Sequence, residues 1–77
     1  MKNTAMAIVA LLNDSKREMD ANEIFLALNN GGKRYSYAAV YSNIRRLCLS
    51  GILKFQHVKA QRQRYFYLNT SRLEKTN

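Results

Sequence analysis

The apolar residues of the sequence change their spacing near Gly51, and this change constrains the fold more than any other feature. Before Gly51 they recur three and four positions apart, as on one side of an α-helix. After it, the segments "ILKFQHVK" and "RYFYL" are rich in β-branched and aromatic residues, and the polar, basic segment "AQRQ" separates them. This combination is typical of a β-hairpin with a charged tip. The sequence therefore predicts helices followed by one hairpin.

The first two helices carry their own start signals. Residues 4–13 form the first, with Asn3 or Thr4 as N-cap and an apolar stripe at Ala5, Ile8, Val9 and Leu12. The second begins after Asp20, which forms a capping box with Glu23, and Gly31 is its left-handed C-cap. Met19 and Ile24 occupy hydrophobic-staple positions, and the core stripe is Ala21, Ile24, Phe25 and Leu28.

The third helix is predicted over about residues 36–50, with Ser36 as N-cap and Gly51 as its end. Its core positions are Tyr37, Val40, Ile44, Leu47 and Cys48, and the hairpin contributes Phe55, Phe66 and Leu68 to the core. Three helices followed by a hairpin are an α+β fold of the winged helix-turn-helix type. A chain of 77 residues suffices for one small domain, which we assign to residues 1–68, with residues 69–77 as a flexible polar tail.

The charges of the chain are unevenly distributed. Thirteen Lys or Arg residues against five Asp or Glu give a net charge of +8, and four of the five acids lie between Asp14 and Glu23. From Ile24 to Leu73 there is no carboxylate, whereas nine basic residues occur there. Such a basic block predicts a polyanionic partner, although a basic surface that only keeps a small protein in solution has the same composition.

The side of the third helix opposite its core stripe has small residues first and two arginines later. Low bulk lets a helix enter the major groove of DNA, and arginine can donate to base edges or phosphates. We therefore expect this helix in the major groove and the basic wing, about residues 58–64, on the backbone or minor groove. The predicted DNA-binding residues are Lys33, Arg34, Tyr35, Ser36, Ala38, Ala39, Tyr41, Ser42, Arg45, Arg46, Lys59, Arg62 and Arg64.

The stretch from Met19 to Gln56 also resembles the DNA-binding domain of ferric uptake regulators. The matching residues are Ala21, Glu23, Ile24, Phe25 and Leu28, then the segment "AAVY" from Ala38 to Tyr41, then "GIL" from Gly51. The resemblance implies that Tyr41 and Ser42 occupy positions of DNA contact, the second of which is usually arginine in that family. We do not expect the family's metal sensing, because the chain has no histidine cluster and no Cys-x-x-Cys pair. We also expect no C-terminal dimerisation domain, so the resemblance does not by itself imply a symmetric dimer.

Several other functions have little support in the sequence. One histidine, His57, and one cysteine, Cys48, are too few for a closed zinc site, and no catalytic motif is visible, so we expect no enzyme activity, metal or cofactor. The apolar run "AMAIVALL" is too short to span a bilayer, so we expect no membrane partner and a cytoplasmic, nucleoid-associated protein. The predicted function is sequence-specific binding of double-stranded DNA as a transcriptional regulator. RNA or ribosome binding and a protein-interaction module remain alternatives, and a homodimer on DNA or a partner regulatory protein stays open.

Overall fold

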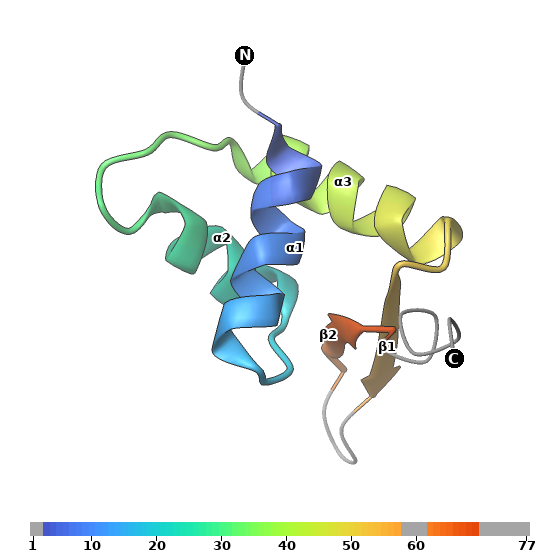
Figure 1. Cartoon of the computed structure of the whole chain (residues 1–77). Coiled ribbons are helices and arrows are strands. Elements are labelled where there is room, and N and C mark those ends of the chain that lie inside the picture. The colour runs from blue at the N-terminus through green and yellow to red at the C-terminus, as the bar shows by residue number, and fades with distance from the viewer. Residues whose placement is uncertain (1–2, 58–61, 70–77) are drawn as a thin grey trace, which may run out of the picture.

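The computed structural model describes residues 3–57 and 62–69 of the chain. Three helices, α1 (Thr4–Ser15), α2 (Ala21–Asn29) and α3 (Tyr37–Leu49), precede the strands β1 (Leu53–His57) and β2 (Arg64–Leu68) (Figure 1). The strands pair antiparallel, with Phe55 opposite Phe66. The predicted order of three helices and a hairpin is therefore confirmed, and the fold is a winged helix-turn-helix.

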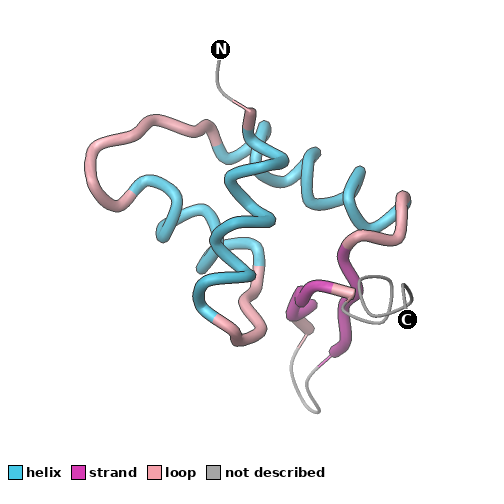
Figure 2. The backbone as a smooth tube through the Cα atoms, viewed as in Figure 1, coloured by secondary structure: helices cyan, strands magenta, loops and turns pink. Residues whose placement is uncertain are grey.

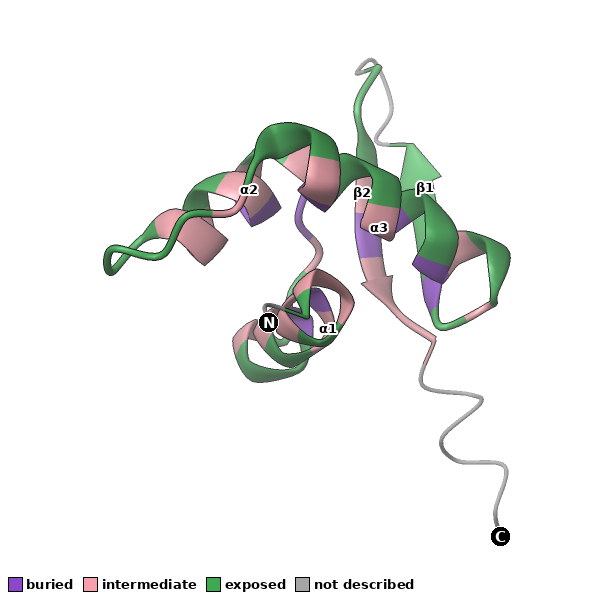
Figure 3. Cartoon of the chain, turned by 90° about the horizontal axis from the view of Figure 1, so that it is seen from above, coloured by how far each residue is buried: buried purple, intermediate pink, exposed green. Residues whose placement is uncertain are grey.

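The core lies where the inner sides of the three helices meet the hairpin. Figure 3 shows the buried positions facing inward and the exposed positions following the outer sides of α2 and α3. The helices supply most of the core as aliphatic side chains. The α1–α2 linker and the two strands each add one residue. Its buried members are Ile8, Leu12, Met19, Ile24, Val40, Ile44, Leu47, Leu53 and Phe66.

Each helix begins at a predicted cap. The Oδ1 atom of Asn3 accepts a hydrogen bond from the backbone N–H of Met6 (3.0 Å), and Ser36 Oγ accepts one from Ala39 (3.1 Å). Asp20 forms the full capping box with Glu23. Capping satisfies backbone donors that the first turn of a helix leaves without partners, so these short side chains set where each helix starts. The predicted C-cap of α2 is wrong: the cap is Asn30, which has an extended backbone and donates its N–H to the carbonyl of Ala27 (3.3 Å), and the positive φ of Gly31, 99°, belongs to the loop that follows.

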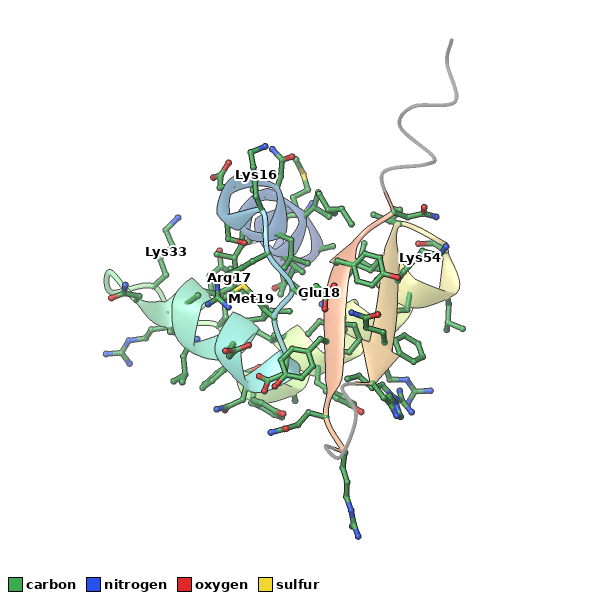
Figure 4. The ribbon with its side chains drawn as sticks, turned by 90° about the horizontal axis from the view of Figure 1, so that it is seen from below. Lys16, Arg17, Glu18, Met19, Lys33 and Lys54 are labelled. Atoms are coloured by element: carbon green, nitrogen blue, oxygen red, sulfur yellow. The ribbon has the colours of Figure 1, made fainter. Side chains whose placement is uncertain are left out.

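The linker between α1 and α2 adds an extended residue to the hairpin, which sequence analysis did not predict. The backbone N–H of Met19 donates to the carbonyl of Phe66 (3.2 Å), and the N–H of Phe66 donates to the carbonyl of Met19 (2.8 Å). Glu18, next to it, faces the hairpin and accepts hydrogen bonds from the Gln56 side chain (2.8 and 2.9 Å) (Figure 4). Because these contacts join the helical half to the wing, the hairpin is held against the helices through β2.

Two predicted core residues are exposed. Tyr37 is 47% exposed and Phe55 is 44% exposed, so their assignment to the core is wrong. Tyr37 is the first residue of α3, where less of the molecule covers the helix, and Phe55 is on the outer strand of the hairpin. On the same face of the hairpin, Phe66 is buried because its strand lies between β1 and the linker.

The end of the first helix and the start of the predicted tail differ in detail from the prediction. The helix α1 runs to Ser15, two residues beyond its predicted end. Asn69, the first residue of the predicted tail, donates from its backbone N–H to the carbonyl of Ile52 (2.9 Å) and from its side chain to that of Gly51 (3.0 Å). The rest of the predicted tail, residues 70–77, lies outside the described residues.

Candidate nucleic-acid interface

The outward side of α3 has the small, exposed residues that the sequence predicted. Ala38 and Ser42 are exposed and Ala39 is half-buried, while the opposite side of the helix buries Val40 and Ile44 in the core. The Ser42 hydroxyl donates back to the carbonyl of Ala39 (3.3 Å), so it adds no bulk beyond the helix surface. The N-terminal half of α3 therefore offers a low surface that another molecule can approach closely.

The C-terminal half of the same helix carries two exposed arginines, Arg45 and Arg46. Arg45 lines a hollow between α3 and the hairpin, together with Leu49, Phe55 and Arg64. Arg46, the next residue of the helix, does not line that hollow. It follows Ser42 by four residues. At this spacing the Arg46 and Ser42 side chains are neighbours on one helix surface.

Two tyrosines form a stacked pair at the start of α3. The ring of Tyr37 lies 5.3 Å from that of Phe25 in an edge-to-face arrangement, and 6.2 Å from that of Tyr41 with only 15° between the planes. Such contacts hold both rings in place although each is partly exposed. Tyr41, one of the predicted DNA-binding residues, thus has a supported ring and is still 42% exposed.

A second hollow continues along α3 past these tyrosines. It is lined by Tyr37, Tyr41, Arg62 and Arg64, and it shares Tyr41, Arg64 and Phe66 with the hollow at Arg45. We call the two together the α3–wing groove. The groove is bordered by exposed cations from the helix and from the start of β2, as an interface with a polyanion requires.

The wing arginines are not equivalent. Arg62 and Arg64 are both exposed, but the Arg64 guanidinium lies over the Phe55 ring, 4.9 Å from its centre. A cation–π contact of this kind fixes the charge in position beside the groove. Lys59, the third predicted wing residue, lies outside the described residues.

The one carboxylate that lines the α3–wing groove already has a partner. Asp20 is buried, and its Oδ1 accepts a hydrogen bond from the backbone N–H of Glu23 at 2.7 Å. The Glu23 side chain in turn accepts from the backbone N–H of Asp20 at 2.9 Å. The Asp20 charge is therefore directed at the first turn of α2, where the helix dipole favours an anion.

The entry to α3 is fixed by one side chain of α2. The Asn29 amide donates to the carbonyls of Phe25 (2.8 Å) and Tyr35 (3.2 Å), and its Oδ1 accepts from the backbone N–H of Tyr35 (2.7 Å). These bonds close the loop of residues 30–35. Because Ser36 directly follows Tyr35, Asn29 sets where the N-terminus of α3 lies.

The residues predicted in the α2–α3 loop lie far from the wing. Lys33 and Arg34 are exposed, and Tyr35 is half-buried against the core. The loop and the hairpin are at opposite ends of the molecule, with α3 between them (Figures 1 and 2). The structure thus brings Tyr41, Arg45, Arg62 and Arg64 to one groove, while the loop residues extend the basic surface beyond the start of the helix.

Sequence analysis missed Tyr37 and Phe25 as parts of this interface. Both have the spacing of core residues, and Phe25 is packed against the core. The signal that was available is the spacing of four residues between Tyr37 and Tyr41, which makes the two rings neighbours on a helix.

Cys48 lines the same hollow as Arg45. Burial raises the pKa of the Cys48 thiol, and the nearby Arg64 charge lowers it by less, so the thiol stays protonated and weakly nucleophilic at neutral pH. Within residues 3–57 and 62–69, no three His, Cys, Asp or Glu side chains lie close enough together to hold a metal ion. None of the helices described is long and apolar enough to cross a membrane.

Comparisons with solved structures agree with the fold. The ferric uptake regulator of Francisella tularensis, solved with iron, has a TM-score of 0.79 at 18% identity, over 90% of this chain and 52% of that one. PerR of Streptococcus pyogenes, described as a protein of peroxide sensing and gene regulation, has a TM-score of 0.76 at 22% identity, over 88% and 46% of the two chains. The adhesin competence repressor of Streptococcus pyogenes has a TM-score of 0.73 at 26% identity, over 97% of this chain and 50% of that one.

This chain spans about half the length of those three solved proteins. A comparison with curated protein sequences finds no match.

The family comparison confirms the resemblance that the sequence indicated. A model of the ferric uptake regulator family matches residues 1–75, which is nearly the whole chain. The solved members share with it the three helices and the hairpin. The chain therefore belongs to the ferric uptake regulator family of DNA-binding transcription regulators, and the part that it shares with the solved members is the winged helix-turn-helix.

Proposed function

We propose that this domain binds double-stranded DNA sequence-specifically, as a regulator of transcription without catalytic activity. The observation that carries the proposal is the outward side of α3, where exposed small residues are followed by exposed Arg45 and Arg46 and flanked by the cationic α3–wing groove. This is the surface that a recognition helix presents to the major groove. The family assignment supports the same conclusion.

In this proposal Ala38, Ala39 and Ser42 let α3 approach the base edges, and Arg46 donates to them. Arginine forms a pair of hydrogen bonds with guanine O6 and N7, which gives a base-specific contact. Tyr41 presents its ring edge and hydroxyl at the border of the α3–wing groove. Lys33, Arg34, Tyr35 and Ser36 lie near the phosphates at the start of the helix.

The wing and Arg45 hold the sugar–phosphate backbone. Arg45, Arg62 and Arg64 border the α3–wing groove, in which a strand of the duplex fits between the helix and the hairpin. Arginines contact phosphates without reading sequence, so they position the recognition helix and supply affinity. Lys59 lies outside the described residues, and its predicted contact with the backbone stays part of the proposal. Two copies on a symmetric site, or one copy with a partner regulator, are both compatible with this docking.

Selection of bound sequences from a random duplex pool tests the proposal directly. A recognition helix that contacts base edges enriches a defined motif, and a palindromic motif indicates two copies. A pool that shows no enrichment after repeated rounds contradicts sequence-specific binding.

A substitution on α3 locates the docking face. Ser42→Glu is expected to abolish duplex binding without unfolding the domain, because it adds bulk and negative charge on the side of α3 that is proposed to enter the major groove. Ser42→Ala is the matched control that keeps the surface low and neutral, and Ser42→Gln adds the bulk without the charge. Fluorescence anisotropy with labelled duplex measures binding, and circular dichroism checks folding. Full binding by folded Ser42→Glu protein rules out this face.

A further inference from the structure

Four residues of α3 form one row along the α3–wing groove. Tyr37, Tyr41, Arg45 and Leu49 follow one another at intervals of four residues, so their side chains are successive neighbours on the helix surface. The first two line one hollow of the groove, and the last three line the other. Tyr41 is therefore the residue of this row that borders both hollows.

The ring of Tyr41 stacks on the residue one turn before it. Long side chains of a helix lean towards its N-terminus, so each of them lies over the residue four positions earlier. For Tyr41 that residue is Tyr37, and the two ring centres are 6.2 Å apart with 15° between the planes. Because Tyr41 is partly exposed, the Tyr37 ring covers a side on which Tyr41 could otherwise turn into solvent.

Tyr37 is itself supported from another helix. It is the first residue of α3, so no earlier turn of that helix lies beneath its ring. Phe25 of α2 supplies the support, with its ring centre 5.3 Å away and 73° between the planes. Phe25 in turn packs against the core. A series of three rings therefore connects the core to Tyr41.

The backbone just before Tyr37 is held as well. The Asn29 side chain binds both the carbonyl and the N–H of Tyr35, and the Ser36 hydroxyl caps the first turn of α3. Tyr37 follows Ser36 directly, so the place at which its side chain leaves the backbone is fixed relative to α2. The position of its ring is therefore set by the contact between two helices and not by α3 alone.

We infer that Tyr37 is a positioning residue for DNA recognition, which holds the Tyr41 ring in the orientation that the duplex meets. The inference rests on the proposed function, in which Tyr41 faces the DNA at the border of the groove. A side chain that is already ordered loses less conformational entropy on binding, so a held ring contributes more affinity than a free one. Tyr37 acts through Tyr41 and not through a contact of its own with the DNA.

Two substitutions separate the ring of Tyr37 from its hydroxyl. Tyr37→Phe keeps the ring and should bind the duplex enriched by selection as well as the wild type does. Tyr37→Leu removes the ring and should weaken binding by roughly three- to tenfold, because Tyr41 must then be ordered on binding. Tyr37 is partly exposed, so both variants should fold, which circular dichroism checks. Equal weakening by both variants indicates a direct contact of the hydroxyl and overturns the proposal.

A double-mutant cycle tests whether Tyr37 acts through Tyr41. Tyr41→Leu removes the ring that is held, so adding Tyr37→Leu to this variant should cause no further loss of affinity. Anisotropy titrations of the wild type, the two single variants and the double variant on the same duplex give the comparison. Additive losses mean that Tyr37 contacts the DNA by itself, and a Tyr41→Leu variant that binds normally means that there is no contact to position. Either result overturns the proposal.

Nuclear magnetic resonance of the free domain provides a readout that does not depend on DNA. An aromatic ring shifts the resonances of a ring stacked on it, so the Tyr41 ring protons should shift clearly in Tyr37→Leu and much less in Tyr37→Phe. Tyr41 resonances that are the same in the wild type and in Tyr37→Leu overturn the proposal, even where duplex binding is intact. A wild-type domain that shows the stack but binds no duplex contradicts the proposed function, and the role of Tyr37 in recognition then fails with it.

Discussion

Lys16 has the one left-handed backbone conformation of a non-glycine residue within the described ranges. It follows the last turn of α1 with φ 54° and ψ 34°, and its N–H donates to the carbonyl of Leu12 (3.1 Å). This is the position at the end of a helix where glycine is preferred, because a side chain strains the left-handed region. The turn towards Met19 and the hairpin therefore carries a local cost in free energy.

Lys16→Gly is expected to raise the free energy of unfolding by roughly 0.5–1 kcal/mol, because glycine adopts this conformation without strain. Urea denaturation followed by circular dichroism measures the change. Lys16→Ala is the control: it removes the same charge but keeps a Cβ atom at a positive φ, so it should not stabilise. Equal stabilisation in both variants would attribute the effect to the charge instead.

Arg45 and Arg46 differ in their surroundings although both are exposed on α3. Arg45 lines the α3–wing groove and Arg46 does not. We expect Arg46→Ala to lose about 1–3 kcal/mol of binding free energy at the preferred site and to relax the preference at one base pair. Arg45→Ala should weaken binding evenly across sequences, as loss of a phosphate contact does. Anisotropy titrations on preferred and scrambled duplexes compare the two, and an even loss for Arg46→Ala makes it a phosphate contact as well.

At the scale of elements, the wing is joined to the helices by β2 and the linker. The Met19–Phe66 backbone pair and the Glu18–Gln56 hydrogen bonds both cross from the linker to the hairpin. The wing arginines therefore keep a defined position relative to α3, which a free two-stranded hairpin could not ensure.

The salt dependence of binding tests the role of the wing. Each phosphate neutralised on B-DNA contributes about 0.9 to the slope of log affinity against log salt, so replacing Arg62 and Arg64 by Gln should reduce that slope by roughly two. Affinity should fall nearly equally on preferred and scrambled duplexes. Replacing Lys16 and Arg17, in the α1–α2 linker, by Gln removes the same number of charges at a site away from the wing. This control should change the slope less. A slope that the wing variant leaves unchanged shows that the wing does not touch the backbone.

At the scale of the whole molecule, the shape of the interface favours duplex DNA over folded RNA. The proposed recognition surface is a helix, which needs a wide major groove, whereas A-form RNA has a deep, narrow one. Competition of labelled duplex with unlabelled DNA of the selected sequence and with a folded RNA of equal length should show displacement by the DNA alone. Equal displacement by RNA at moderate salt supports the RNA-binding alternative, and no binding of either supports a protein-interaction module.

The helices, their caps and the hairpin could be predicted from the chain alone. Capping by Asn3, Asp20 and Ser36 depends on residues three positions apart, and the one-sided apolar stripes depend on neighbouring turns. Both features can therefore be recognised in the sequence. The same local logic predicted the low outward side of α3 and its two arginines. The resemblance to ferric uptake regulators rested instead on motif residues shared with that family, and the family match over residues 1–75 confirms it. The DNA contacts assigned to these residues stay predictions.

How the elements cover one another could not be predicted locally, because it depends on the packing of segments that are distant in the chain. Tyr37 and Phe55 have core-like spacing, but they stay partly exposed. Within the described part of the chain, the neighbouring rings and the Arg64 guanidinium cover only one side of each of them. The pairing of Met19 with Phe66 and the open side of α1 likewise depend on which distant segments meet. Burial is a property of the assembled layers and not of a segment, so a local pattern can name an apolar residue without determining whether the fold covers it.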